Sequence, residues 1–129
     1  MAVQQRKVIS TKDAPNALGP YSQAVKTDSM VFVSGQLGLD PVTGEIVAGD
    51  VQTETRQVMT NLGAILSAAG SNFELVVKAT VFVANLTDFA KINAVYAEFF
   101  GEEAPARACV EVAHLPKNAR VEIDLIALV

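Results

Sequence analysis

The chain has 129 residues, of which 50% are hydrophobic and 19% are charged, with a formal net charge of −4. This length predicts one domain over residues 1–129. The ten Lys and Arg residues are scattered, which makes nucleic acid an unlikely partner. No run approaches the ~18 unbroken apolar residues of a membrane helix. We expect the surplus apolar surface to be buried between copies of the chain in a homo-oligomer.

The cysteine content and the start of the chain bear on the compartment. Cys109 is the single cysteine, so no intrachain disulfide can form and a reducing compartment is expected. Residues 1–7 lack the apolar core of a secretory signal. We therefore expect a cytoplasmic protein. An organelle stays open as an alternative, because a transit peptide that had already been removed would leave no trace.

The first part of the chain has the composition of strands and turns. A short strand is expected at residues 7–10, followed by a loop at 11–20 that contains Pro and Gly. Residues 21–26 and 30–34 are typical of two strands of a hairpin. The segment 35–49 is rich in turn-forming residues.

A helix is expected from Asp50, as its N-cap, to about Ala69, with Gly70 at its end. Its apolar residues follow helical spacing, so one face is predicted to pack into the core. A nearly continuous apolar run at 75–83 is typical of a central strand covered on both faces. The predicted core face of the helix consists of Val51, Val58, Leu62, Ile65, Leu66 and Ala69.

A second helix is expected at residues 88–100, with Thr87 as its N-cap, and two strands are expected at 105–112 and 120–125. The order is strands, helix, strand, helix, two strands. This order predicts an α+β fold with a single mixed β-sheet, crossover connections and both helices packed on one face. The predicted buried stripe of the second helix is Phe89, Ile92, Tyr96 and Phe99.

Arg107 lies in a predicted strand between small apolar residues, where its planar fork suits a carboxylate or a phosphate. Strand alternation places Arg107 and Cys109 on one face, and we expect Glu122 and Asp124 on that same face, opposite the helices. Alternatively, Arg107 is a structural ion-pair partner of Glu111, Glu122 or Asp124. Glu122 could neutralise an arginine or act as a general acid or base.

The spacing of these residues raises a geometric difficulty. If the last two strands formed a hairpin, Glu122 would face Glu111, and Arg107 would lie four residues along, roughly 14 Å away. One small molecule could not touch both side chains. Either the last two strands are not neighbours, or the site combines residues from two subunits.

Other chemical motifs are weak. Cys109 and His114 fall on opposite faces of a strand and no third group orients the histidine, which disfavours a thiol nucleophile. A single histidine predicts no metal site. Tyr21 at a strand start usually packs into a core. Asn93, one residue past Ile92, is either a partly buried helix residue or a site contact.

Five segments together resemble the reactive intermediate deaminase (RidA-type, imine deaminase) family, and the resemblance covers nearly the whole chain. It implies a homotrimer of chorismate-mutase-like α+β subunits, with three sites in the clefts between subunits and the last strand in a central position. The segments are Gly19 to Ala24, Val33 to Gln36, Asp88-Phe89 with Asn93, Pro105 to Arg107, and Leu115 to Lys117 leading to Val121-Glu122-Ile123.

The resemblance implies hydrolysis of 2-imino or enamine acids, such as 2-aminoacrylate, 2-iminopropanoate and 2-iminobutanoate, to 2-oxo acids and ammonia without a metal or cofactor. Arg107 would hold the substrate carboxylate, Glu122 would position and deprotonate a water, and Tyr21 would orient the imine or the water. The remaining implied substrate contacts are the backbone groups of Gly35 and Cys109 and the side chains of Ser34 and Asn93.

Two other functions stay open. One is a single-strand RNA endoribonuclease that inhibits translation, which the acidic net charge and the aromatic content of 6% disfavour. The other is a non-catalytic, ligand-binding or chaperone-like trimer that presents apolar surface.

Overall fold

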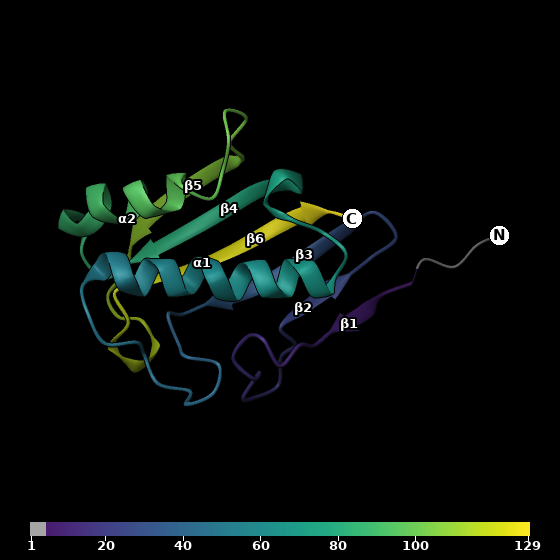
Figure 1. Ribbon diagram of the computed structural model, residues 1–129, viewed down its shortest axis with the longest axis horizontal. Coiled ribbons are helices and arrows are strands. Elements are labelled where there is room, and N and C mark those ends of the chain that lie inside the picture. The colour runs from purple at the N-terminus through teal and green to yellow at the C-terminus, as the bar shows by residue number, and fades with distance from the viewer. Residues whose placement is uncertain (1–4) are drawn as a thin grey trace.

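The computed structural model describes residues 5–129; residues 1–4, on which part of the expectation about a secretory signal falls, lie outside the described residues. Six strands form one sheet and two helices lie against one of its faces (Figure 1). The strands are β1 (Lys7–Ile9), β2 (Ala24–Lys26), β3 (Met30–Gln36), β4 (Val76–Val83), β5 (Ala106–Glu111) and β6 (Val121–Leu128). The helices are α1 (Val51–Ala68), α2 (Phe89–Ala97) and the short 3₁₀ helices η1 (Phe73–Leu75), η2 (Leu86–Asp88) and η3 (Pro116–Asn118).

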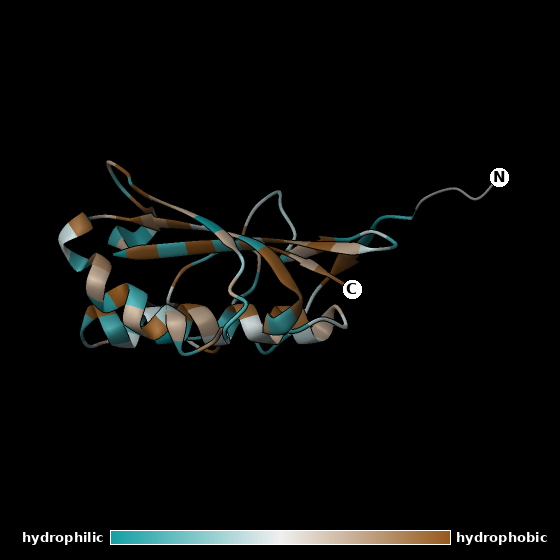
Figure 2. Cartoon of the chain, turned by 90° about the horizontal axis from the view of Figure 1, so that it is seen from above, coloured by the Kyte–Doolittle hydropathy of each residue, from teal (hydrophilic) through white to brown (hydrophobic). Residues whose placement is uncertain are grey.

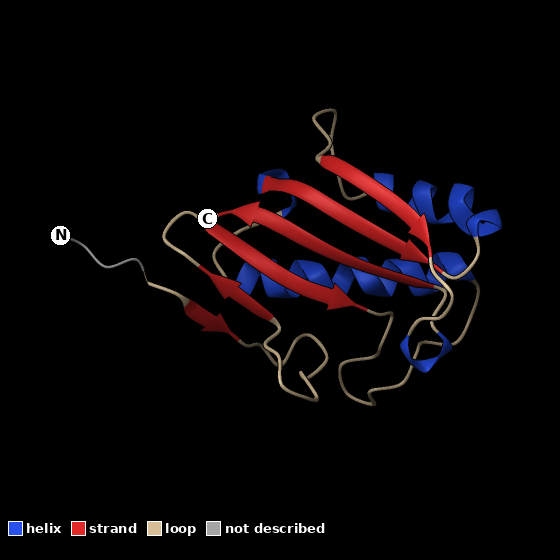
Figure 3. Ribbon diagram, turned by 180° about the vertical axis from the view of Figure 1, so that it is seen from behind, coloured by secondary structure: helices blue, strands red, loops and turns tan. Residues whose placement is uncertain are grey.

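The strand order is β1-β2-β3-β6-β4-β5, and all neighbours are antiparallel except β4 and β5, which are parallel. The last strand, β6, lies between β3 and β4 and is not a neighbour of β5. The crossovers through α1 and α2 put both helices on the same face (Figures 1 and 3). The predicted α+β fold with a single mixed sheet and a central last strand is therefore confirmed.

Helix α1 supplies much of the core. The Asp50 side chain accepts a hydrogen bond from the Thr53 backbone N–H at 2.8 Å, which caps the helix as predicted. Gly70 adopts φ +81° just beyond the end of the helix, a conformation that glycine accepts without strain. All six residues of the predicted core face are buried.

Helix α2 is shorter than predicted. The Asn85 side chain, not that of Thr87, accepts the capping bond, from the Thr87 backbone N–H at 2.9 Å. The polypeptide thus enters α2 through the 3₁₀ turn η2, and Asp88 at the start of α2 makes no side-chain cap. Ile92 and Tyr96 are buried as predicted, whereas Phe89 is 36% exposed.

The predicted strand at 21–26 is also too long, since β2 begins at Ala24. Tyr21 lies in the preceding loop, where its backbone N–H donates to the Gly19 carbonyl at 2.9 Å. Because of this tight turn, in which Gly19 has φ +140°, Tyr21 does not belong to a strand of the sheet. The phenol is therefore 53% exposed and is not packed into the core.

The face of the sheet opposite the helices has no cover from the described residues (Figure 2). The central strand β4 was predicted to be covered on both faces, but only alternate residues of β4 are buried. Large apolar side chains lie on this open face, among them Phe32 and Val110, which are 45% and 44% exposed. Among the described residues, no helix is both long and apolar enough to cross a membrane.

Candidate active site

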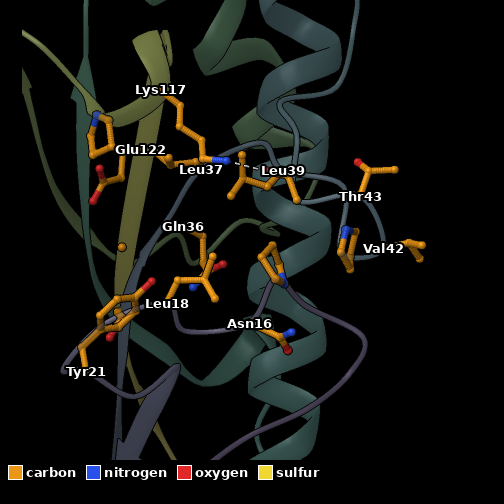
Figure 4. Close-up of a pocket in the computed structure, with 16 residues that line it drawn as sticks. Asn16, Leu18, Tyr21, Gln36, Leu37, Leu39, Val42, Thr43, Lys117 and Glu122 are labelled. Carbon is orange, nitrogen blue, oxygen red and sulfur yellow. Dashed lines mark hydrogen bonds between the residues drawn. The ribbon is translucent and has the colours of Figure 1, made fainter.

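A cavity of about 750 Å³ opens between the loop before β2, the segment after β3 and the η3 turn (Figure 4). Tyr21, Ser34, Gly35 and Glu122 line one end of it. We call it the Glu122 cavity. The structure thus brings together four of the predicted site residues, which come from three separate segments of the chain.

A buried glutamine fixes one wall of the Glu122 cavity. Gln23 is 3% exposed; its side-chain oxygen accepts from the Thr11 backbone N–H at 2.7 Å, and its amide donates to the Pro15 carbonyl at 2.7 Å. Nearby, the Ser34 hydroxyl donates to the Ser22 carbonyl at 2.6 Å. These bonds hold the loop that carries Tyr21. We did not predict this role for Gln23, because its partners lie in an irregular loop with no periodic pattern.

Glu122 packs directly against the backbone of Gly35. A Cβ atom added at Gly35 would overlap the Glu122 carboxylate and lie 3.0 Å from its carboxyl carbon. A larger residue here would displace the Glu122 side chain, so Gly35 permits this close approach. Burial, reinforced by the negative charge of Asp124, raises the pKa of Glu122 above its ordinary range. A carboxyl group of raised pKa is suited to accepting and returning a proton.

An ion pair between the partly exposed Arg120 and the buried Glu54 anchors the start of β6, two residues before Glu122. The Arg120 guanidinium donates from Nε to Glu54 Oε1 at 2.7 Å, and the Arg120 backbone N–H donates to Glu54 Oε2 at 2.7 Å. Glu54 is 1% exposed, so its charge needs this partner. No local pattern in the sequence indicates this pair. Because Arg120 is bound to Glu54, it is not available to bind the anionic group of a ligand.

Arg107 lies on the edge strand β5 beside a second, smaller cavity of about 430 Å³. Its Nη1 group donates to Asn93 Oδ1 at 2.7 Å. Its guanidinium carbon lies 4.8 Å from the centre of the Tyr96 ring and 5.5 Å from that of Phe89, both within cation–π range. Within residues 5–129, no carboxylate forms a salt bridge with Arg107. The alternative that Arg107 is a structural ion-pair partner is therefore wrong for the subunit.

One prediction about faces was wrong. Arg107 and Cys109 lie on the helix side of the sheet, whereas Glu122 and Asp124 lie on the open face. The cause is the register: β4 pairs Val81 with Cys109 on one side and with Ile123 on the other. Since Val81 and Ile123 face the core, Cys109 shares their side and Glu122 does not.

The thiol has no catalytic partner in this arrangement. Cys109 is half-buried and packs against the hydrophobic core. Burial raises the pKa of the Cys109 thiol, and the nearby Arg107 charge only partly opposes this. Over the described part of the chain, no cluster of three or more His, Cys, Asp or Glu side chains is placed to hold a metal ion.

Arg107 and Glu122 cannot contact one small molecule within a single subunit. Strands β5 and β6 are separated by β4, which sets their backbones roughly 10 Å apart across the sheet. Glu122 is level with Val110, three residues along β5 from Arg107, or roughly another 10 Å. Their side chains also point to opposite faces. The subunit therefore presents two half-sites.

The subunit is thus an α+β domain with a half-buried carboxylate in one cavity and an arginine fork beside another, an arrangement suited to binding a small acid. The family model described as Endoribonuclease L-PSP matches residues 11–129, and the chain belongs to this family. This confirms the family expected from the resemblance.

Known members of the family are similar over almost their whole length. The 2-iminobutanoate/2-iminopropanoate deaminase of Bos taurus is 54% identical, over 95% of this chain and 90% of its own. The structure of E. coli TdcF with bound serine is 50% identical, with a TM-score of 0.90 over 95% of this chain and 98% of its own. RidA from the Antarctic bacterium Psychrobacter is 46% identical, with a TM-score of 0.91 over 95% and 99%.

Proposed function

We propose that this protein hydrolyses reactive 2-imino and enamine acids, such as 2-iminopropanoate and 2-iminobutanoate, to 2-oxo acids and ammonia. The sites are shared between the subunits of a cytoplasmic homotrimer. The observation that carries the proposal is the placement of Arg107 and Glu122 on opposite faces of one sheet, each beside its own cavity. The high identity to a deaminase of this specificity supports the reaction.

Arg107 binds the substrate carboxylate in this proposal. Asn93 accepts one N–H of the guanidinium and the Tyr96 ring packs beside it, which leaves further N–H groups for two carboxylate oxygens. Charge-assisted contacts of this kind contribute on the order of 1.5–3 kcal/mol each. Binding the acid at two points fixes its C=N bond relative to an attacking water.

Glu122 of the neighbouring subunit takes a proton from a water, whose oxygen bonds to the imine carbon while the C=N π electrons move to nitrogen. Glu122 then returns that proton to nitrogen. Glu122 then takes the hydroxyl proton of the resulting amino alcohol and delivers it to the nitrogen. The C–N bond breaks with ammonia as the leaving group while the oxygen electrons form the C=O bond of the 2-oxo acid. An imine carbon is already electrophilic, so acid–base catalysis and positioning are sufficient.

The other predicted contacts complete the lining. Tyr21 is half-exposed at the cavity and orients the imine or the water. Ser34 and the backbone of Gly35 contact the substrate from the same cavity. Asn93 holds Arg107, and only the backbone of Cys109 takes part, because its side chain packs against the core.

The homotrimer brings the two half-sites together. The open face presents Phe32, Phe82, Val110 and Ile126, and exposed apolar patches of this kind mark contact surfaces. A head-to-tail contact repeated around a three-fold axis closes into a ring and sets one subunit's Arg107 against the next subunit's Glu122. Each trimer then carries three equivalent sites.

The experiment couples a threonine dehydratase to this protein and measures release of 2-oxobutanoate from fresh 2-iminobutanoate. Wild-type protein should accelerate release above the rate in buffer. Differently tagged Arg107→Ala and Glu122→Gln chains, each inactive alone, are then co-expressed. Each mixed trimer should regain one active site of its three, because one of its three subunit contacts pairs an intact Arg107 with an intact Glu122. With equal amounts of the two chains, random assembly then restores about a quarter of all sites.

No acceleration by the wild type would contradict the reaction. Acceleration by the wild type without recovery in mixed trimers of verified composition would contradict the shared site while leaving the reaction in place.

The second candidate function is cleavage of single-stranded RNA, favoured by the description of the family model. The net charge of −4 weighs against it, because RNA binding usually needs a basic groove with stacking aromatic residues. Salt-sensitive RNA cleavage that is lost in Glu122→Gln would place this function first.

A further inference from the structure

The Glu122 cavity continues well beyond its reacting end. Figure 4 shows Tyr21 and Glu122 at one end, Val42 and Thr43 at the other, and Leu18 between them. The continuation is lined mainly by apolar side chains, and we call it the apolar arm. The apolar arm consists of Leu18, Leu37, Leu39, Pro41 and Val42.

Two residues of the apolar arm have no role in the core. Leu18 is 80% exposed and Val42 is 93% exposed, although they belong to loops 24 positions apart in sequence and line the same cavity. Single exposed leucines need no explanation, and Leu86 of η2 is one. Leu18 instead lies beside one cavity together with Leu37 and Leu39, which is typical of a ligand pocket, and Val42 lies at the outer rim of that cavity.

The wall of the apolar arm is held in place before any ligand arrives. Asn61 is fully buried in α1, and its amide donates to the carbonyls of Leu37 at 3.1 Å and Leu39 at 2.9 Å. On the other wall, the buried Gln23 side chain holds the carbonyl of Pro15, three residues before Leu18. A preformed wall lowers the entropy lost on binding.

The lining of the apolar arm disfavours a charged ligand side chain, because most of its side chains are apolar. Among the described residues that line the cavity, Lys117 is the one ionic side chain apart from Glu122. Its Nζ group donates to the Gly44 carbonyl at 2.8 Å. The cavity of about 750 Å³ falls in the range of roughly 300–1,000 Å³ that holds drug-sized ligands. The single methyl group of 2-iminopropanoate is too small to fill the apolar arm.

We propose that the apolar arm is a side-chain subsite that receives the long apolar side chain of a 2-imino acid, with Leu18 as the residue that determines this specificity. The inference rests on the proposed function and deepens it. Such substrates form when an amino acid with a branched or long aliphatic side chain is oxidised at its amine. The subsite gives the protein a preference for them over 2-iminopropanoate.

The test generates the two imines in place, from leucine and from alanine, with an amino-acid oxidase and catalase, and compares kcat/KM for their hydrolysis. Wild-type protein should favour the leucine-derived imine. Leu18→Ala should lower the ratio of the two kcat/KM values about tenfold, in line with the loss of methylene contacts in an apolar pocket. Leu86→Ala, the same change at an exposed leucine outside the cavity, should leave the ratio unchanged.

A second readout separates the subsite from the reaction. Calorimetry compares binding of 4-methyl-2-oxopentanoate and pyruvate, which are the product acids, and Leu18→Ala should remove the preference for the longer acid. If the wild type hydrolyses neither imine but keeps this preference, the proposed function fails and the subsite stands. An unchanged ratio in Leu18→Ala, or equal losses for both substrates, overturns the subsite.

Discussion

The Glu122 cavity and the Arg107 cluster (Arg107 with Asn93, Tyr96 and Phe89) are built in different ways. Glu122 lies on a central strand, half-buried, against a glycine that leaves no space for a Cβ atom. Arg107 lies on the edge strand, exposed, and is held by one hydrogen bond and two aromatic rings. The position of the carboxylate thus depends on the sheet, whereas the guanidinium is positioned by its contacts with one helix.

This difference matches the two tasks. An acid–base group needs a controlled environment, because desolvation sets its pKa. An anion-binding fork needs reach and correct orientation, which an edge strand and a stacking helix provide without burial. The comparison predicts that substitutions at Arg107 act on substrate binding with little effect on the fold, and that substitutions at Glu122 act on both proton transfer and stability.

The largest effect is expected at Arg107. Arg107→Ala should lower kcat/KM on the order of 10²–10⁴-fold, because two charge-assisted hydrogen bonds to the substrate are lost. Arg107→Lys should be nearly as impaired, since an ammonium group cannot reproduce the planar fork. Steady-state kinetics with 2-iminobutanoate checks this, with trimer mass and circular dichroism as controls. Wild-type turnover by both variants would remove Arg107 from the site.

Glu122→Gln should lower kcat by about 10²–10⁴-fold through loss of the proton acceptor. The same change should stabilise the protein at neutral pH. Burial raises the pKa of Glu122 above its ordinary value of 4.5, so its contribution to stability is present below that pH and is lost as the pH rises through the folded-state pKa.

Denaturant unfolding of the wild type and the variant, from about pH 4 to about pH 8, checks the sign of this effect. The free energy of unfolding of Glu122→Gln, relative to the wild type, should increase across that range. A relative stability that falls with rising pH would mean that the folded state favours the charged carboxylate.

A smaller effect is expected at Tyr96, where ring and hydroxyl can be separated. Tyr96→Leu should lower kcat/KM by about 2-fold to 30-fold, the range of a cation–π contact of about 0.5–2 kcal/mol. Tyr96→Phe keeps the ring and should retain near-wild-type kinetics with equal or higher stability, because the buried hydroxyl has no hydrogen-bond partner among the described residues. Equal kinetic losses in both variants would assign a role to the hydroxyl.

The smallest effect is expected at Cys109. Its thiol packs against the core and its pKa is raised, so neither nucleophilic attack nor proton transfer is required of it. Cys109→Ala should change the activation free energy by less than about 0.5 kcal/mol, as measured by kcat/KM. A loss comparable to that of Glu122→Gln would contradict the backbone-only role.

Much of the fold was predictable because its signals are periodic. The apolar spacing of α1, its Asp50 cap and the Gly70 stop are local properties of the sequence, and all three are confirmed. The start of α2 was not predictable in the same way. Asn85 and Thr87 are both good capping residues, and the preference for Asn85 depends on the path of the polypeptide through η2.

The candidate site residues were named from the sequence and stay a prediction, and their geometry could not be predicted. Alternation along β5 shows which side chains share a face, whereas the face itself is set by the register with β4. Gln23, Asn61 and Glu54 hold the walls, yet their partners are backbone groups or residues far along the chain, so no local pattern indicates them. Leu18 likewise reads as an ordinary loop leucine until the cavity is known.

The separation of the carboxylate and the guanidinium onto opposite faces of one sheet would link catalysis to self-association in the proposed homotrimer. We therefore expect the specific activity to decline on dilution, as trimers dissociate. When the protein is concentrated again, activity should return at a rate that depends on the protein concentration to a power greater than one. Measuring turnover would then report how much of the protein is trimeric. A molecule that covers the open face of the sheet should inhibit the protein without entering either cavity.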